Sequence, residues 1–442
     1  MGIKGPDLRI PSHLTFRRQP SNMDYILPGT VEETSEEISL FEGPVTEIGL
    51  GSCEYQEYRP VSQITHGSPI TFSLNSTEYI DLNKTRLNLK VRIVKENGEA
   101  IAIADKVGFV NLVFHSLFRT VDVNLQHTAT TTDVGTNYPY KAMMDTLLDE
   151  VTGSLEAQMF YKDTYAFMDS TQVNTGQNGG LTDRWSRTMH GSSVELEGPI
   201  HADILKQDRL LLNGVRLDVV LHTQSDAFCL MVDGDAKYKV HLMDATLKVC
   251  CNKISSGTLA AHAKMLETKN ALYPYTHSTV KVYNIPKGSY TWTMDDLFQD
   301  KIPSKVVIGM VPEQAYSGST SRNPFNFQNW DVNYISFLVN GHSRPGQPFQ
   351  PDYDNNMYMT PYVAMAKKYR DDGTRVKHFE FASGYCLYVF QVEDNTSIIK
   401  KGNTRVVLKM SKPLPESVSI IVYGHFPGMM EIDKTRMATL HV

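Results

Sequence analysis

Short segments in which apolar and polar residues alternate recur along this chain of 442 residues, and they constrain its fold more than any other feature. Examples are "ITFSLN" at 70–75, "TRLNLKVRIV" at 85–94, "GVRLDVVLH" at 214–222 and "TRVVLKM" at 404–410. A period of two places successive side chains on opposite faces of a strand, so one face of each segment can pack on a core. Roughly a dozen such strands with few helices predict an all-β protein built of sandwiches.

One order of segments occurs twice. In the first half, "VDVNLQH" leads through a polar loop to "NYPYKAMMDTLL" at 137–148, and in the second, "ISFLVNGH" leads through a polar loop to "MYMTPYVAMA" at 357–366. In both halves a pair of strand-like segments follows. The copies lie roughly 200 residues apart, which is the length of a domain and far longer than a solenoid unit. We therefore expect two tandem β-sandwiches of one kind; the alternative is chance similarity between two unrelated β-domains.

The chain divides into four regions. A helix-like run with a serine cap, "SSGTLAAHAKMLET" at 255–268, separates the two sets of strands. We expect an extended N-terminal arm at 1–40, a first sandwich at 41–254, a helical connector at 255–270 and a second sandwich at 271–442. The arm has four prolines between residues 6 and 28 and no strand periodicity, so it should not continue a sheet.

Composition excludes several classes of protein. The net charge of -6 argues against a surface that binds nucleic acid directly, because phosphate neutralisation needs clustered lysine and arginine. No apolar run approaches the length of about 18 residues that a membrane span requires. The five cysteines are odd in number and show no CxxC spacing, so we expect reduced, mostly buried thiols.

Motifs of catalysis and cofactor binding are missing from the sequence. It contains no G-x-S-x-G elbow, P-loop or HExxH motif. The "HAD" of His201–Asp203 offers two possible ligands, but a metal site needs three or four, and a polar surface pair is the preferred interpretation. We therefore predict a protein that is not an enzyme and that binds no cofactor or metal.

Two long polar loops, at 161–193 and 312–330, carry aromatic residues. Loops of this length inside a compact domain are usually functional. Aromatic residues in polar loops suit contacts with other proteins. The alternative is that these loops are exposed to solvent and have no partner. Two arginines in the arm could anchor it on an acidic neighbour. The candidate subunit-interface residues are Arg17, Arg18, Tyr165, Phe167, Trp185, Phe325, Phe327 and Trp330.

Several long motifs resemble one family of viral proteins. They are "YIDLNKTRLNLKVRIV", "VNLVFHSLFRTVDVNL", "NYPYKAMMDTLL", "NPFNFQNWDVNYISFLVNG" and "LPESVSIIVYGHFPGMMEID". Together they resemble proteins scattered through animal genomes that are shared with adomaviruses, adintoviruses and Maverick/Polinton-type elements. The resemblance spans roughly residues 37–436. It indicates the hexon-like major capsid protein of that lineage.

The resemblance implies a double jelly roll, in which two eight-stranded rolls stand side by side. It implies a homotrimer whose six rolls fill a pseudo-hexagonal position in an icosahedral shell, next to other capsomers, penton proteins and minor capsid proteins. It also implies a virion location, after synthesis in the host cytoplasm and possible assembly in the nucleus. The internal repeat supports this assignment independently.

Other assignments stay open at this point. A penton protein with a single type of roll is one, although it would need only one sandwich. A carbohydrate-binding tandem β-sandwich protein, an enzyme on a jelly roll, and a capsid gene domesticated by its host are the others.

Overall fold

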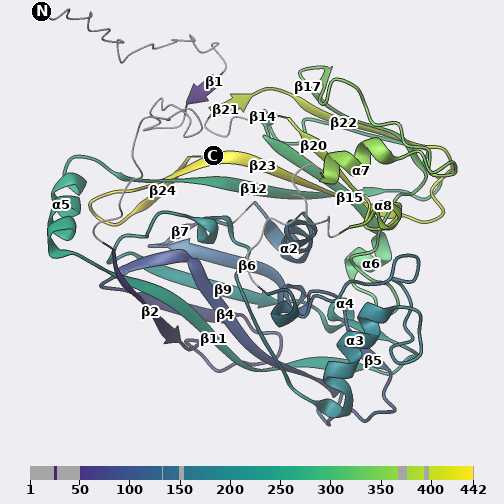
Figure 1. Ribbon diagram of the computed structural model, residues 1–442, viewed down its shortest axis with the longest axis horizontal. Coiled ribbons are helices and arrows are strands. Elements are labelled where there is room, and N and C mark those ends of the chain that lie inside the picture. The colour runs from purple at the N-terminus through teal and green to yellow at the C-terminus, as the bar shows by residue number, and fades with distance from the viewer. Residues whose placement is uncertain are drawn as a thin grey trace, which may run out of the picture.

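The computed structural model describes residues 24–26, 50–131, 133–148, 154–366, 376–392 and 398–441. It consists of two β-sandwiches that lie against each other along their length (Figure 1). The connector helix α5 (Ser256–Leu266) lies at one end of the molecule, and most of the short helices lie at the other end.

The first sandwich contains two four-stranded antiparallel sheets. One has the order β2-β11-β4-β8, and the other has the order β3-β9-β6-β7. The bounds of these strands are β2 (Leu50–Tyr58), β3 (Ile70–Asn75), β4 (Tyr79–Lys95), β6 (Phe118–Leu125), β7 (Thr128–Ala129), β8 (Val194–Gly198), β9 (Arg216–Thr223) and β11 (Tyr238–Ile254).

The second sandwich repeats this arrangement. Its sheets have the orders β12-β23-β15-β20, with β24 beside β23, and β13-β22-β17-β18. The bounds are β12 (Ala271–Ile285), β13 (Thr291–Asp295), β15 (Lys305–Pro312), β17 (Val332–Val339), β18 (His342–Ser343), β20 (Leu387–Gln391), β22 (Thr404–Met410), β23 (Val418–Ile432) and β24 (Ala438–His441).

The two strand orders are identical when eight strands of each half are counted along the chain, leaving out β24, which only extends the sheet beside β23. In both halves one sheet contains the first, eighth, third and sixth strands, and the other contains the second, seventh, fourth and fifth. This is the order of a jelly roll. The chain is a double jelly roll, and the repeat predicted from the sequence is confirmed. We call the halves roll 1 and roll 2.

The smaller elements lie in the loops. Two short sheets pair β5 (Val107–Phe109) with β10 (Leu230–Val232), and β16 (Phe327–Gln328) with β19 (Ser383–Gly384). The helices besides α5 are α1 (Val113–Ser116), α2 (Tyr138–Leu147), α3 (Gly179–Thr188), α4 (Asp226–Cys229), α6 (Glu313–Ser317), α7 (Met359–Ala366) and α8 (His378–Phe381), with 3-10 turns η2 (Gly135–Asn137), η3 (Glu156–Gln158), η4 (Met189–Gly191) and η5 (Asp203–Lys206).

One described piece of the arm contradicts its expected lack of pairing. The strand β1 (Asp24–Ile26) pairs antiparallel with β21 (Ile398–Lys401), which also pairs with β14 (Lys301–Ile302). This short stretch contains no proline, so its backbone can join a ladder.

Local sequence explains the helix starts. Ser255 Oγ accepts a hydrogen bond from the Thr258 N–H at 3.2 Å, which confirms the predicted serine cap of α5. Asn178 caps α3 in the same way through the Leu181 N–H. Pro139 lies in the first turn of α2, where a missing N–H costs nothing.

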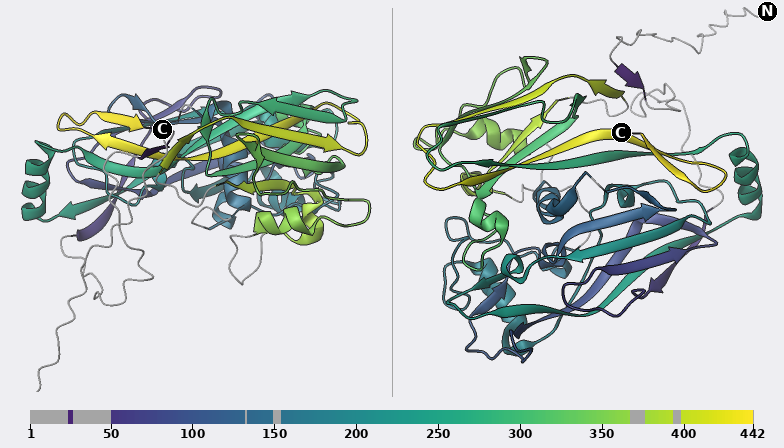
Figure 2. Two further views of the ribbon diagram at one scale, coloured as in Figure 1. Left: turned by 90° about the horizontal axis from the view of Figure 1, so that it is seen from above. Right: turned by 180° about the vertical axis from the view of Figure 1, so that it is seen from behind.

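Burial distinguishes the sheets. Along β3 and β22, buried residues alternate with more exposed ones, as in a sheet that covers one core. Along β23 every residue except Glu431 is buried, so both of its faces are covered. One face covers the core of roll 2, and the other faces roll 1 and its helix α2. This helix lies between the two rolls when the molecule is seen from the front and from behind (Figures 1 and 2).

The cysteines depart in part from expectation. Cys53 of β2 and Cys250 of β11 form a disulfide, whereas Cys229, Cys251 and Cys386 are buried thiols. The pairing of β2 with β11 brings the two joined residues together across neighbouring strands.

Candidate functional site at the junction of the two rolls

The helix α2 fills the junction between the rolls, and all ten of its residues are buried. Two of them are charged. Lys141 and Asp145 are one helical turn apart, and their Nζ and Oδ2 atoms are 3.1 Å from each other. A buried charge needs a partner, and this pair is the start of a larger set.

Four charged side chains meet at this point, two lysines and two aspartates. Asp145 accepts hydrogen bonds from Lys206 Nζ at 2.8 Å and, across the junction, from the hydroxyl of Tyr423 at 2.7 Å. Asp203 Oδ1 lies 3.2 Å from Lys141 Nζ. Asp203 also accepts from the N–H and the hydroxyl of Ser278 in β12, at 2.7 and 2.8 Å. We call Lys141, Asp145, Asp203 and Lys206 the charge cluster.

Two histidines lie beside the charge cluster, and both are almost completely buried. Their rings meet edge to face with centroids 4.3 Å apart. His115 makes close contacts through both ring nitrogens, at 2.9 Å to the Tyr138 hydroxyl and 2.8 Å to Gln158 Oε1. His201 Nδ1 lies 3.2 Å from Asp145 Oδ2.

The environment fixes the ionisation of these groups. Burial alone would raise the pKa of Asp145, but Lys141 and Lys206 outweigh it and hold that pKa well below its ordinary value. Burial alone would lower the pKa of Lys141, but Asp145 and Asp203 raise it. Burial lowers the pKa of His201 to about 4, against the opposing attraction of Asp145. At neutral pH the cluster therefore holds two cations, two anions and neutral histidines.

This arrangement can align the rolls. Its donors and acceptors come from α2 and η5 of roll 1 and from β12 and β23 of roll 2, so a shift of one roll along the other would leave buried charges unpaired. Among the described residues, no group of three or more His, Cys, Asp or Glu side chains is arranged to hold a metal ion. The cluster has the character of a structural clamp.

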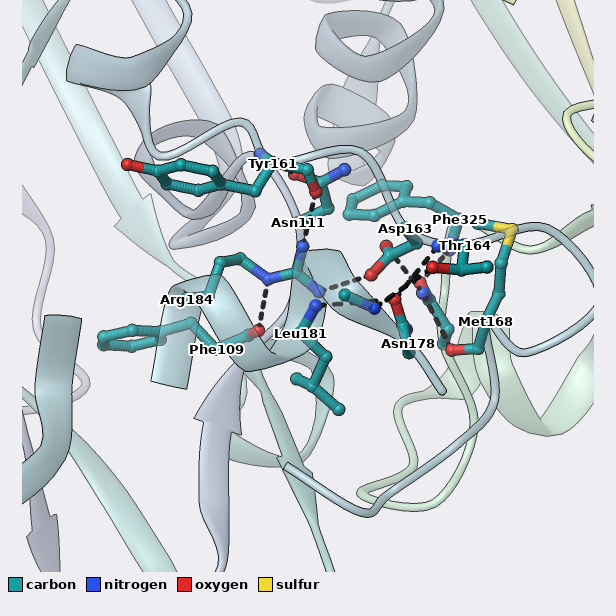
Figure 3. Close-up of polar contacts among 12 residues, drawn as sticks. Phe109, Asn111, Tyr161, Asp163, Thr164, Met168, Asn178, Leu181, Arg184 and Phe325 are labelled. Atoms are coloured by element: carbon teal, nitrogen blue, oxygen red, sulfur yellow. Dashed lines mark hydrogen bonds and ion pairs between the residues drawn. The ribbon is translucent and has the colours of Figure 1, made fainter. Parts of the chain in front are cut away.

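A second polar network joins the long loops (Figure 3). The guanidinium of Arg184 in α3 donates to the carbonyls of Phe109 and Tyr161, at 2.8 and 2.6 Å, and to Asp163 Oδ1 at 2.6 Å. Arg184 and Asp163 have fully buried side chains. This ion pair holds the loop at 161–178 against α3 and β5.

The same loop is bonded to roll 2. Asp163 Oδ2 accepts from the side-chain amide of Asn323 at 3.1 Å, and the Asp163 carbonyl accepts from the Tyr385 hydroxyl at 2.9 Å. Asp169 accepts from the Asn323 N–H and from the Asn326 side chain, at 2.8 and 2.9 Å. The two loops predicted to make interactions therefore bind each other within one chain.

Aromatic rings pack beside this network. Tyr140 of α2 contacts Phe325, Phe327, Phe228 and Tyr316, with ring centroids between 5.6 and 6.5 Å apart. The tyrosine of the repeated segment in roll 1 thus packs on the long loop of roll 2.

The predicted interface residues fall into three groups. Phe325, Phe327 and Trp330 are buried within the chain, at 1%, 0% and 8% exposure, and Trp185 is half-buried against the core. Because their side chains are used inside the chain, we do not retain these four as contacts to another subunit. Tyr165 and Phe167 are exposed, at 40% and 43%. Arg17 and Arg18 lie outside the described residues.

The exposed pair borders a larger apolar surface. The ring of Tyr165 packs on Phe379 of α8, which is itself exposed, with centroids 4.9 Å apart. The helix α8 contacts α7, in which only Pro361 and Met365 are buried. We define the α7 patch by its exposed apolar residues: Tyr165, Phe167, Met357, Met359, Val363 and Phe379.

The sequence interpretation missed the charge cluster. His201 and Asp203, expected as a polar surface pair, are 1% and 5% exposed. Their neighbours across the junction belong to roll 2, which sequence spacing does not reveal. The sequence did contain one signal of this cluster. Lys141 and Asp145 are spaced i,i+4 inside the apolar run "YKAMMDTLL", so on a helix the two charges lie on one face and can pair.

No family model matches the chain. A curated relative, an uncharacterized protein of Caenorhabditis elegans, is 23% identical over 391 residues, covering 82% of this chain and 90% of the relative.

Among solved structures, the chain is similar to the Sputnik virophage structure with a TM-score of 0.58 at 11% identity, covering 93% of both chains. It is similar to the mavirus major capsid protein with a TM-score of 0.52 at 12% identity, covering 96% of this chain and 97% of that one. For the Faustovirus major capsid protein the TM-score is 0.52 at 8% identity, covering 90% and 93%. The shared fold is the double jelly roll. The mavirus and Faustovirus neighbours are major capsid proteins.

None of the helices in the described ranges combines the length and the apolar character needed to cross a membrane.

Proposed function

We propose that this chain is a structural major capsid protein of a double-stranded DNA virus, or a protein derived from one, and that it forms homotrimeric capsomers. The double jelly roll that it shares with the virophage, mavirus and Faustovirus structures supports the capsid role. The assignment to the adintovirus, adomavirus and Maverick lineage rests on the sequence motifs alone. We take residues 1–40 as the arm, 41–254 and 271–442 as the two rolls, and 255–270 as the connector.

The observation that carries the trimer is the asymmetry of the junction. Roll 1 contributes its helix α2, and roll 2 contributes the sheet of β12 and β23. The two rolls have the same topology, so each also has the element that the other uses. The junction is therefore a heterologous contact. Within the part of one chain that the structure describes, the helix of roll 2 that corresponds to α2 has no second roll to pack on. The sheet of roll 1 that corresponds to the sheet of β12 and β23 likewise receives no helix from another roll.

Those two elements are exposed. The helix α7, which follows the fourth and fifth strands of roll 2 as α2 follows those of roll 1, carries Met359 and Val363 at 55% and 46% exposure. The sheet β2-β11-β4-β8 of roll 1 exposes Tyr55 and Met243, at 55% and 40%. Exposed apolar surface of this kind marks interaction sites.

If α7 of one chain packs on the β2-β11-β4-β8 sheet of the next as α2 packs on β12 and β23, every roll meets its neighbour in the same way. Three chains contribute six rolls, and the repeated contact closes into a ring with a pseudo-sixfold outline. Tyr165 and Phe167 then lie at the seam between chains. Such a ring suits a six-neighbour position in a shell, next to other capsomers, penton and minor capsid proteins, in a virion made from protein synthesised in the host cytoplasm.

The test is the native mass of the purified protein by light scattering, followed by negative-stain imaging of the same peak. We expect three times the chain mass of 49.8 kDa and a hexagonal outline. A pentamer would move the assignment to a vertex protein, and a stable monomer would contradict the capsomer.

A further inference from the structure

An apolar groove lies at the connector end of the molecule, away from the junction loops. It is bounded by α5, by residues 209–212 before β9 and by the start of β12, and its volume is about 720 Å³. Its apolar walls are formed by Leu210, Leu212, Ile254, Met265, Leu266 and Tyr273. A concave site of this size is in the range that small ligands occupy.

The helix α5 is poorly covered. None of its eleven residues is buried, and Met265 on the groove side is 58% exposed. Leaving apolar area in contact with water costs about 25 cal/mol for each Å². The groove therefore favours an occupant that covers these side chains with apolar atoms.

The charged groups of the groove are cationic. Arg209 and Lys269 line it, and among the described lining residues none is acidic. The Arg209 guanidinium donates to the Leu272 carbonyl at 2.7 Å, three residues from Lys269, so the two cations flank the start of β12. An anionic group at this point would gain from both charges.

Hydrogen bonds occupy the remaining polar side chains of the groove, some of them to residues outside its lining. The Tyr79 hydroxyl and His262 Nδ1 are 3.0 Å apart, and the Tyr273 hydroxyl donates to the Leu210 carbonyl at 3.1 Å. A peptide in the groove would bring backbone N–H and C=O groups against apolar walls, where they would lack partners. An acyl chain has no such groups.

We propose that this groove binds a long-chain fatty acid, with its hydrocarbon chain along Leu212, Met265 and Leu266 and its carboxylate between Arg209 and Lys269. The site is separate from the α7 patch.

The test uses the purified full-length protein in its native oligomeric state. A fluorescent fatty-acid analogue is titrated below its micelle concentration and then displaced with saturated fatty acids of ten to sixteen carbons. We expect saturable binding with one site per chain. Because burial of each methylene contributes about 0.8 kcal/mol, removal of one methylene should weaken binding about fourfold.

Matched variants locate the site. Met265→Glu, at an exposed position on the groove wall, should weaken binding at least tenfold. Ala260→Glu, at an exposed position on the opposite face of the same helix, should not change it. Arg209→Gln combined with Lys269→Gln should weaken palmitate binding about tenfold and leave hexadecanol binding unchanged; Lys264→Gln is the control. Absence of saturable binding, equal binding by the two glutamate variants, or an affinity independent of chain length would each overturn the proposal.

Discussion

The phenolic hydroxyl of Tyr423 in roll 2 donates a 2.7 Å hydrogen bond to the carboxylate of Asp145 in roll 1. Both side chains are completely buried. The bond therefore links the two rolls where water cannot compete for either group, and the buried charge makes it stronger than a bond between neutral partners.

Tyr423→Phe should loosen this link. A hydrogen bond to a charged group contributes about 1.5–3 kcal/mol, so the urea midpoint of unfolding should fall accordingly. Tyr290→Phe, at a tyrosine that is 54% exposed, is the matched control and should leave the midpoint unchanged. Equal midpoints for both variants would show that the bond does not hold the rolls together.

Asp145→Asn should be more damaging, because it removes the anion that Lys141 and Lys206 share. Breaking a buried ion pair by removing one partner costs about 3–5 kcal/mol. The control is Asp244→Asn, which breaks the exposed pair with Arg59 and should have no measurable effect. A small loss for Asp145→Asn, measured by urea unfolding, would mean that water reaches the cluster.

Stability should fall on acidification. His201 has its pKa lowered to about 4 by burial, whereas an unfolded histidine titrates near 6.5. The unfolded chain therefore binds a proton first, and stability is lost as the pH falls from about 6.5 to 4, by on the order of 3 kcal/mol. The pKa values of Asp145 and Asp203 are also lowered, so protonating them at still lower pH acts in the same direction.

The pH effect can be assigned with His201→Gln. Melting temperatures across this pH range should depend less on pH in the variant than in the wild type. The other titratable or charged groups around His201 are His115, Asp145, Asp203, Lys141 and Lys206, and the variant leaves them in place. An unchanged slope would place the acid sensitivity elsewhere.

Arg184→Leu should release the loop at 161–178. It leaves the carboxylate of Asp163 buried without its cation, at a cost of about 3–5 kcal/mol. Limited proteolysis should then cut this loop faster than in the wild type. Asp183→Leu, at an exposed position of the same helix, is the control, and equal cleavage rates would contradict the role given to Arg184.

Met359→Glu combined with Val363→Glu should prevent trimer formation without unfolding the chain, because both side chains are exposed in the single chain. Light scattering should then give one chain mass, with an unchanged circular dichroism spectrum. Met265→Glu adds one such charge at an exposed methionine on α5 and should remain trimeric. A trimer that survives the double substitution would show that the α7 patch is not the seam.

The fold could be predicted because its signals are local. Alternation along β3 and β22, the serine cap at Ser255 and the repeated segments at α2 and α7 each depend on residues close in sequence. The order of the strands within a sheet does not depend on residues close in sequence. The same order of segments occurs twice, however, and this restricted the predicted fold to two copies of one sandwich.

The junction could not be predicted in the same way. In the other roll, Asp145 is bonded to Tyr423, which lies 278 residues away, and Asp163 is bonded to Asn323, which lies 160 residues away. The long loops did carry an interaction signal in Phe325 and Phe327. Their aromatic composition showed that they contact protein but not whether that protein is the same chain.

The buried helix α2 has a consequence for synthesis. The strands of roll 1 lie between residues 50 and 254, whereas β12 and β23, which cover α2, begin at Ala271 and Val418. A ribosome therefore completes roll 1 while the charge cluster and the apolar side of α2 still face water or chaperones. Expressed alone, roll 1 should be prone to aggregate, and the complete chain is the smallest unit that covers this surface.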